Sequence, residues 1–259
     1  MNITKKILNK KYFDKQNQIL KLSLKTYKDV NSFFKKVIIF GLPLIIIFPF
    51  LPLLLLDSGL TYYELVKLEK SLNLTVAIFF FPLIAIFVHR HIILKEEKYQ
   101  SWYFIFGFFK LRYWKFILNS ILLMIIFWSI LMLTLSVASK ISFILFLLAF
   151  PIGIYVQSRL SLCFPLIATN KKGWFIKSFI LTKNLGLSLP LAYFAIFLPI
   201  IFFQALISII ITISDYSFYS DIIPIYIIGV IDVFLRLYTV SLLATFFSNV
   251  YLIVKEDQL

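Results

Sequence analysis

Asp232 and Arg236 are the two residues whose spacing most directly suggests chemistry. They lie four residues apart within a long apolar segment, so on a helix they share one face and can form an ion pair. Ionisable side chains inside a membrane are costly, and by default they suggest a functional path. The alternative is an ion pair that fixes one helix against its neighbours. Because no further charge extends a relay through the apolar segments, the sequence favours the structural interpretation.

A short cluster, His89, Arg90 and His91, contains both histidines of the chain. A zinc site needs three or four His, Cys or carboxylate ligands, and Glu96 and Glu97 are the nearest groups that could complete one. The ligand spacing of a zinc site is missing. A basic cluster at the end of a helix, where the helix dipole favours cations, is therefore the preferred interpretation, and no metal is predicted.

A polar and basic stretch separates two apolar segments in the middle of the chain. Its polar members are Gln157, Ser158, Arg159, Ser161 and Thr169, followed by Ser178, Thr182, Lys183 and Asn184. Basic pockets between membrane helices on the cytoplasmic side bind anionic lipid headgroups. The candidate headgroup contacts are Arg90, Arg159, Lys171, Lys172, Lys177 and Lys183. Helix capping together with ordinary cytoplasmic positive charge is the plainer alternative, and the sequence alone favours it.

Sequence motifs of catalysis and cofactor binding are missing from the chain. It contains no GxxxxGK[ST] phosphate loop, no GxGxxG, no GxSxG and no HExxH. Its seven glycines leave little material for loops that cradle phosphate, and no two carboxylates are placed to act as general acid and base. Its single cysteine excludes an internal disulfide. The sequence therefore predicts a protein that is not an enzyme and needs no cofactor.

The composition indicates a membrane protein. Of the 259 residues, 61% are hydrophobic and 15% are charged, whereas soluble domains are about 45–50% apolar and about 25% charged. The net charge of +14 does not indicate nucleic-acid binding, because the basic residues flank apolar segments and form no soluble basic face. We expect an all-α fold, a polytopic membrane helix bundle with membrane lipids as its partners.

Six apolar segments are candidates for membrane-spanning helices, for which roughly 20 residues are needed. Two of them are short, and each can be extended past the arginine that follows it. The six segments are Val37–Leu56, Leu74–Val88, Phe116–Val137, Phe143–Gln157, Ser188–Ile213 and Ile222–Ile253.

The chain before the first apolar segment is polar and rich in lysine. We divide the sequence into a basic N-terminal segment, residues 1–36, a six-span transmembrane domain, 37–254, and a short tail, 255–259. The N-terminal segment does not read as a signal peptide, because its polar part is too long and no cleavage site follows. Leu20–Phe34 suits an amphipathic helix on the membrane surface, and a solvated tail is the equal alternative.

Positive charge alternates from one connection to the next and predicts the orientation. Of the 26 lysine and arginine residues, 22 lie in the two tails, in His89–Lys115 and in Ser158–Leu187. Three lie in the remaining connections. Positive charge concentrates on the cytoplasmic side of membrane proteins. We therefore expect a multi-pass protein of the bacterial inner membrane with both termini in the cytoplasm.

The two basic connections are also rich in aromatic and large aliphatic residues. Trp102, Trp114 and Trp174 stand among their lysines and arginines. No clean stripe of apolar residues with a 3.6-residue period runs through either connection. Such segments suit interfacial helices whose aromatic rings lie at headgroup level while lysines reach the phosphates. We predict interfacial cytoplasmic helices in both connections.

Two segments resemble a known protein family. From Arg159 the chain reads RLSLCFPLIATNKKGWFIKSFILTKN, and from Phe87 it reads FVHRHIILKEE. Both are similar to segments of an uncharacterised family of six-span bacterial inner-membrane proteins, over about Val88 to Ile201. That family is distantly similar to the membrane domain attached to some glycerophosphodiester phosphodiesterases. The catalytic barrel of those enzymes, with its His and Glu metal ligands, has no counterpart here, so the resemblance implies a fold and a topology and carries no activity.

Two classes of function fit these observations. The first is a non-enzymatic inner-membrane protein of envelope or lipid homeostasis, which the basic and aromatic connections favour. The second is a transporter or permease subunit of the ATP-binding-cassette type, whose cytoplasmic connections would contact an ATPase. A protein partner is compatible with both, although the sequence identifies none.

Overall fold

The computed structural model describes residues 2–54, 64, 71, 75, 78–95, 109–136, 142–213 and 222–255. Over these residues it consists of helices and turns, without strands. The helices are α1 (Asn2–Leu54), α3 (Phe81–Leu94), α5 (Leu111–Ser136), α6 (Ser142–Leu160), α7 (Cys163–Ala168), α8 (Trp174–Thr182), α9 (Ser188–Ile213) and α10 (Ile222–Lys255). The prediction of an all-α fold is confirmed for this part of the chain.

Every predicted apolar segment overlaps a helix, and their ends agree to different degrees. The segment Ser188–Ile213 coincides with α9, and α10 extends only two residues past its predicted end. The predicted second segment ends at Val88, whereas α3 continues past Arg90 to Leu94. This continuation follows the apolar sequence after the arginine.

Within the described residues, three helical stretches are long and apolar enough to cross a membrane. They are Leu111–Ile130, Phe150–Ala168 and Val230–Lys255. Among the described residues, Phe81–Leu94 and Ser188–Phe203 are shorter apolar helices. The molecule is therefore compatible with a membrane-embedded protein.

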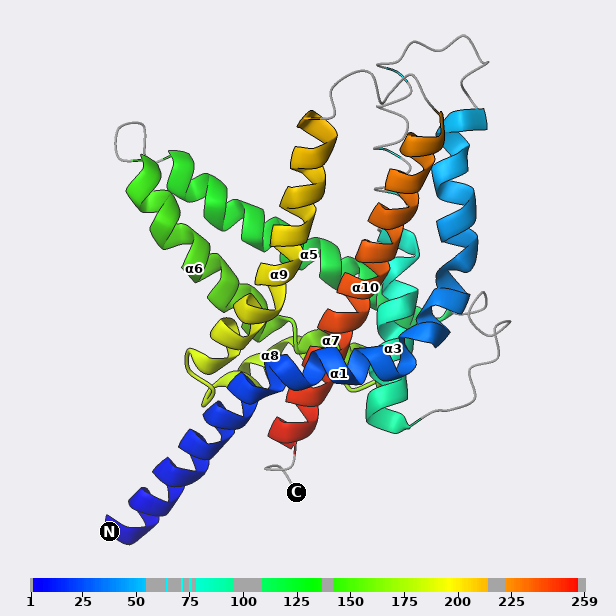
Figure 1. Ribbon diagram of the computed structural model, residues 1–259. Coiled ribbons are helices and arrows are strands. Elements are labelled where there is room, and N and C mark those ends of the chain that lie inside the picture. Colours follow the sequence, from blue (N-terminus) through cyan, green and yellow to red (C-terminus); the bar gives the residue numbers. More distant parts are fainter. Residues whose placement is uncertain are drawn as a thin grey trace.

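Successive long helices run in alternating directions through the bundle. In the view of Figure 1, α5 and α9 rise, whereas α3, α6 and α10 descend. The N- and C-termini both lie toward the lower end of the bundle (Figure 1). The short helices α7 and α8 also lie at this lower end, which brings together segments that the sequence predicts to be basic and cytoplasmic.

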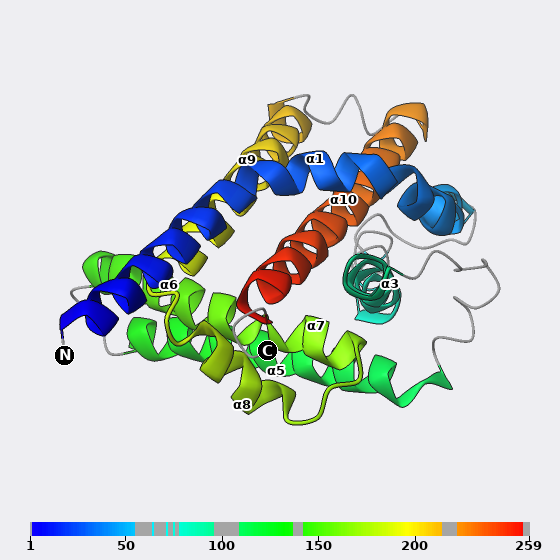
Figure 2. The same ribbon diagram turned by 90° about the horizontal axis from the view of Figure 1, so that it is seen from below.

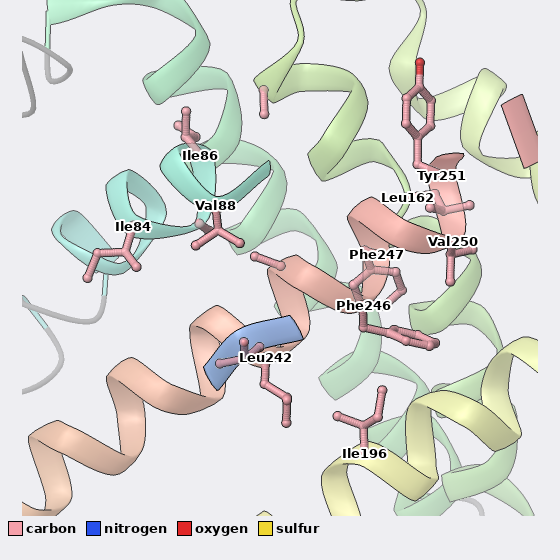
Figure 3. Close-up of a cluster of buried hydrophobic side chains, with 14 of the residues drawn as sticks. Ile84, Ile86, Val88, Leu162, Ile196, Leu242, Phe246, Phe247, Val250 and Tyr251 are labelled. Carbon is pink, nitrogen blue, oxygen red and sulfur yellow. The ribbon is translucent and has the colours of Figure 1, made fainter. Parts of the chain in front are cut away.

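The best-buried part of the core surrounds the lower half of α10. Leu242, Phe246 and Val250 of this helix are fully buried. They belong to one apolar cluster with Val88 of α3 and Ile196 of α9 (Figure 3). Burying apolar side chains of this size stabilises a fold by about 1.5–3 kcal/mol each in water. Helix α10 therefore holds the neighbouring helices in place at the lower end.

Helix α1 continues across the predicted boundary between residues 36 and 37 without a break. Its first part crosses α9 and α10 near their lower ends, and its second part stands upright beside α10 (Figures 1 and 2). Near the start of the predicted span, the sequence contains Gly41 and Pro43, residue types at which helices bend. A Cβ atom added at Gly41 would lie 2.5 Å from Cδ1 of Leu237, so the glycine allows α1 to approach α10 closely.

The exposed side of α5 is apolar. Leu118, Leu122 and Ile125 are exposed, while Asn119 is buried and donates a hydrogen bond from its Nδ2 to the Sγ of Cys163. Only 28% of the stretch Leu111–Ile130 is buried in the chain. A helix on the surface of a water-soluble protein has polar and charged residues on its exposed side. This arrangement is typical of a helix that faces lipid.

Candidate functional site

The candidate site lies where α6, α7 and α8 meet at the lower end of the bundle. We call this region the basic rim and define it as residues 155–184. Helix α7 ends in a turn in which Asn170 has a φ of 58°, and α8 begins after Gly173, which has a φ of 67°. The Lys171 N–H donates to the Leu166 carbonyl at 2.9 Å. This is the pattern of a Schellman motif, in which a left-handed residue ends the helix and reverses the chain.

Arg159, near the end of α6, joins α6 to α8. Its Nε donates to Oγ1 of Thr182 at 3.0 Å, and its Nη2 donates to the Phe179 carbonyl at 3.1 Å. Its Nη1 donates to the Tyr155 hydroxyl at 3.0 Å. The guanidinium also lies over the rings of Tyr155 and Phe179, at 5.5 and 5.3 Å from the centroids. A charged donor used in this way holds three acceptors in one geometry.

Helix α8 places its hydroxyl side chains inward and its two isoleucines outward. Ser178 is fully buried, and its hydroxyl donates to the Arg159 carbonyl at 2.5 Å, one of the carbonyls that α6 leaves unpaired at its end. Thr182 is also buried. Ile176 and Ile180, by contrast, are 69% and 58% exposed. In water this arrangement would be unfavourable, because the larger apolar side chains would remain hydrated.

The four lysines predicted to contact headgroups are all exposed at the basic rim. They are Lys171, Lys172, Lys177 and Lys183. The first two lie in the turn before α8, Lys177 lies within α8, and Lys183 follows its last residue. They therefore border the exposed isoleucines of α8. A fifth lysine, Lys115 of α5, lies over the ring of Trp174 with its Nζ 5.1 Å from the ring centroid.

The two predicted arginine contacts are arranged differently from the lysines. Arg90 of α3 donates from Nη1 to the Ala168 carbonyl at 3.0 Å, at the end of α7. Arg159 donates to the three acceptors described above. Both arginines thus connect helix ends within the chain, and headgroup binding by either one stays a prediction.

His89 is buried at the interface between α3 and α10. Its Nδ1 lies 2.7 Å from Oγ of Ser248, whose hydroxyl donates to the Ala244 carbonyl at 2.7 Å. Because a serine hydroxyl has a single proton, Nδ1 of His89 must be the donor in this pair. His89 is therefore a core residue that joins α3 to α10.

His91 lies apart from the His89 contact. Its ring lies 5.8 Å from that of Phe33 and 5.9 Å from that of Phe87, measured between centroids. Glu96 and Glu97, the carboxylates considered for a metal site, lie outside the described residues. Within the described part of the chain, no group of three or more His, Cys, Asp or Glu side chains is placed to hold a metal ion.

Asp232 and Arg236 form the ion pair expected from their spacing. The Arg236 Nε lies 2.7 Å from the Asp232 Oδ2, and the two side chains are 38% and 35% exposed. Both residues lie within the apolar stretch Val230–Lys255 of α10. The pair is thus local to one helix, and about a third of each side chain is open to the surroundings of the bundle.

Two partners in these contacts were not identified from the sequence. Tyr155 lies four residues before Arg159, a helical spacing that places both on one face and could have indicated their hydrogen bond. Ser248 lies 159 residues from His89. No local pattern links two residues so far apart, so this contact depends on the packing of α3 against α10.

No family model, curated protein or solved structure matches the chain. The likeness of the segments from Phe87 and Arg159 to a six-span membrane-protein family therefore stays a prediction from the sequence.

Proposed function

We propose that this chain is a non-enzymatic, multi-pass protein of the bacterial inner membrane that binds anionic lipid headgroups at its basic rim and acts in envelope or lipid homeostasis. Three apolar helical stretches support the membrane location. The exposed lysines of the basic rim support the lipid class, because a lysine ammonium attracts phosphate. The likeness to a six-span inner-membrane family agrees with this proposal.

The arrangement of α8 is the observation that carries the proposal. Its hydroxyl groups are used by the bundle, while Ile176 and Ile180 face outward between exposed lysines. At a membrane surface, the isoleucines would enter the boundary between headgroups and acyl chains. Lys177 and Lys183 would extend from the same helix toward the phosphates. One helix would thus satisfy both the apolar and the charged layer of the interface.

The direction of the helices supports the proposed topology. The long helices alternate in direction, and both termini lie at the end of the bundle that carries the basic rim (Figure 1). A six-span protein with cytoplasmic termini requires this alternation. The charge distribution in the sequence favours the same orientation independently, because positive residues concentrate in the tails and the two basic connections.

Lipid retention tests the proposal. The purified full-length chain would be placed in nanodiscs of mixed phosphatidylglycerol and phosphatidylethanolamine, and bound lipid would be identified by native mass spectrometry after mild detergent release. We expect the triple variant K171Q/K172Q/K177Q to lose most of the retained phosphatidylglycerol. The matched control, K67Q/K70Q/K140Q, removes three lysines that the sequence predicts on the opposite side, and it should retain wild-type amounts. Equal retention by both variants would contradict lipid binding at the basic rim.

A pull-down in mild detergent separates this proposal from the permease alternative. A permease subunit should recover a nucleotide-binding subunit in stoichiometric amount, because its cytoplasmic connections would contact that subunit. We expect phospholipid and no such ATPase. Stoichiometric recovery of an ATPase would replace lipid homeostasis by transport as the function of the chain.

A further inference from the structure

The N-terminal part of α1, residues 13–37, has a buried stripe that attaches it to the rest of the molecule. We call this part the arm. Its buried residues include Ile19, Leu22, Thr26, Val30 and Phe33, spaced three or four residues apart as the core-facing side of a helix requires. They cover α9 and α10 near their lower ends (Figure 2). The apolar stripe that a surface helix would otherwise insert into lipid is thus already used by the protein.

Polar contacts fix the arm in one position on the bundle. The Tyr27 hydroxyl donates to the Ile196 carbonyl of α9 at 2.9 Å. The Asn249 side chain of α10 donates from Nδ2 to Oδ2 of Asp29 at 2.9 Å. These contacts tie the arm to two different helices, so its orientation about its own axis is determined. Each remaining face of the arm therefore has a defined direction.

A second, narrower apolar strip runs along the exposed side of the arm. Phe13, Leu20 and Leu24 are 63%, 40% and 76% exposed. Their spacings of seven and four residues place them on one face of the helix. None of the three belongs to the stripe that packs on α9 and α10. The bundle thus leaves a row of three large apolar side chains uncovered on a helix that it otherwise holds firmly.

A row of lysines accompanies the exposed strip. Lys21, Lys25 and Lys28 are exposed and are separated by four and three residues, so they also share a face. Lys21 directly follows Leu20, and Lys25 directly follows Leu24. Consecutive residues of a helix are about 100° apart around its axis, so the lysine face adjoins the apolar strip. The exposed half of the arm has one apolar edge and one basic face.

We propose that the arm is a lipid-anchored brace: it stays docked on α9 and α10 while Phe13, Leu20 and Leu24 insert into the anionic cytoplasmic leaflet. Lys21, Lys25 and Lys28 then contact lipid phosphates. The inference rests on the proposed membrane location of the bundle, but it uses a different helix from the basic rim. Juxtamembrane lysines contribute about 1 kcal/mol each near an anionic surface.

The occupant of the strip is a lipid surface and not a second copy of the chain. Stable protein interfaces bury about 800 Å² on each partner, which three side chains in a single row do not provide. A symmetric contact would also bring the lysine faces of two arms together, and like charges repel. An anionic leaflet complements both the narrow apolar edge and the adjoining lysines.

Fluorescent labels test where the strip lies. An environment-sensitive probe such as NBD would be attached to L24C in the full chain in nanodiscs; the native Cys163 is buried. The matched control is S32C, an exposed arm position four residues after Lys28 on the lysine face. We expect a blue shift at position 24, with quenching by nitroxide-labelled lipid, and an aqueous spectrum at position 32. The variant K21Q/K25Q/K28Q should reduce the shift in anionic nanodiscs and leave it unchanged in zwitterionic ones.

The same experiment separates the arm from the proposed function. A third label at I180C reports whether α8 lies in lipid. An aqueous probe at position 24 together with a lipid-embedded probe at position 180 would overturn the brace and leave the basic rim intact. The reverse pattern would support the brace and contradict the rim. A probe at position 24 that is shielded from aqueous iodide but not quenched by nitroxide lipid would indicate a protein partner and also overturn the brace. If L24C does not yield a monodisperse protein, F13C gives the same reading.

Discussion

Single residues of this chain serve mainly to connect helices. Arg90 reaches the end of α7, Arg159 holds α8, and His89 donates to Ser248. Each donates to a carbonyl or hydroxyl oxygen of another helix, and polar groups paired in this way avoid the cost of standing unpaired in an apolar surrounding. The exposed lysines of the basic rim form a second group, whose side chains lie on the surface. This division separates residues that connect the helices from the exposed lysines that the proposed function assigns to lipid headgroups.

The Asp232–Arg236 pair gives a prediction about assembly. A lone charge near the bilayer centre costs about 2.5–3.5 kcal/mol on insertion scales. Removing one member should therefore harm the protein more than removing both. We expect Asp232→Asn or Arg236→Leu alone to lower the amount of folded protein in the membrane, and the double variant to recover much of it. Quantitative immunoblotting of membranes and size-exclusion chromatography measure this.

Two further results bear on the same pair. If all three variants accumulate normally and yet abolish the phenotype of a deletion strain, the pair is functional and the structural interpretation fails. The reversal Asp232→Arg with Arg236→Asp is a finer test. Because the ion pair lies within one helix, we expect partial tolerance of the reversal, limited by whatever each charge then faces on neighbouring helices.

At the scale of elements, α8 depends on Arg159 for its attachment. Arg159→Gln removes the charge and most of the donors, so Thr182 and the end of α8 lose their common partner. Hydrogen bonds to charged groups contribute about 1.5–3 kcal/mol each. We expect faster proteolysis between residues 169 and 187 and a lower thermal midpoint, with only partial rescue by Arg159→Lys, since an ammonium cannot reproduce the planar guanidinium. Lys172→Gln, at an exposed lysine of the same rim, is the control and should behave like wild type.

The elements also show what the sequence could and could not predict. Long apolar segments bounded by polar residues predict the ends of α9 and α10 closely. The reason is that a helix suited to a bilayer has an apolar length close to the thickness of the hydrocarbon layer. The sequence fits Leu20–Phe34 equally well to a surface helix and to a solvated tail. The structure shows a helix whose apolar stripe packs on protein, a result that depends on α9 and α10 and has no signal within residues 13–37. The aromatic residues 102–108 lie outside the described residues, so the interfacial helix expected there stays a prediction.

For the whole molecule, the distribution of charge favours the proposed orientation. The arm, the basic rim and both termini gather at the same end of the bundle (Figure 1), and the N-terminal segment and the basic rim are rich in lysine. Apolar residues cover much of the surface of the described helices between the two ends. A bundle with an apolar surface between its ends and lysines at its lower end fits a bilayer whose cytoplasmic leaflet is anionic.

The orientation gives a prediction for the entire chain: six spans with both termini in the cytoplasm. It rests on 22 of the 26 basic residues lying on the predicted cytoplasmic side and on the alternating direction of the helices. Alkaline phosphatase fused after Asp57, Lys140 or Ser214 should be active, because this reporter folds only outside the cytoplasm, where disulfides form. Green fluorescent protein fused after Lys172 or Lys255 should fluoresce. Inactive phosphatase at Lys140 would place α5 and α6 on one side of the membrane as a hairpin that does not cross it, and the spans would number four.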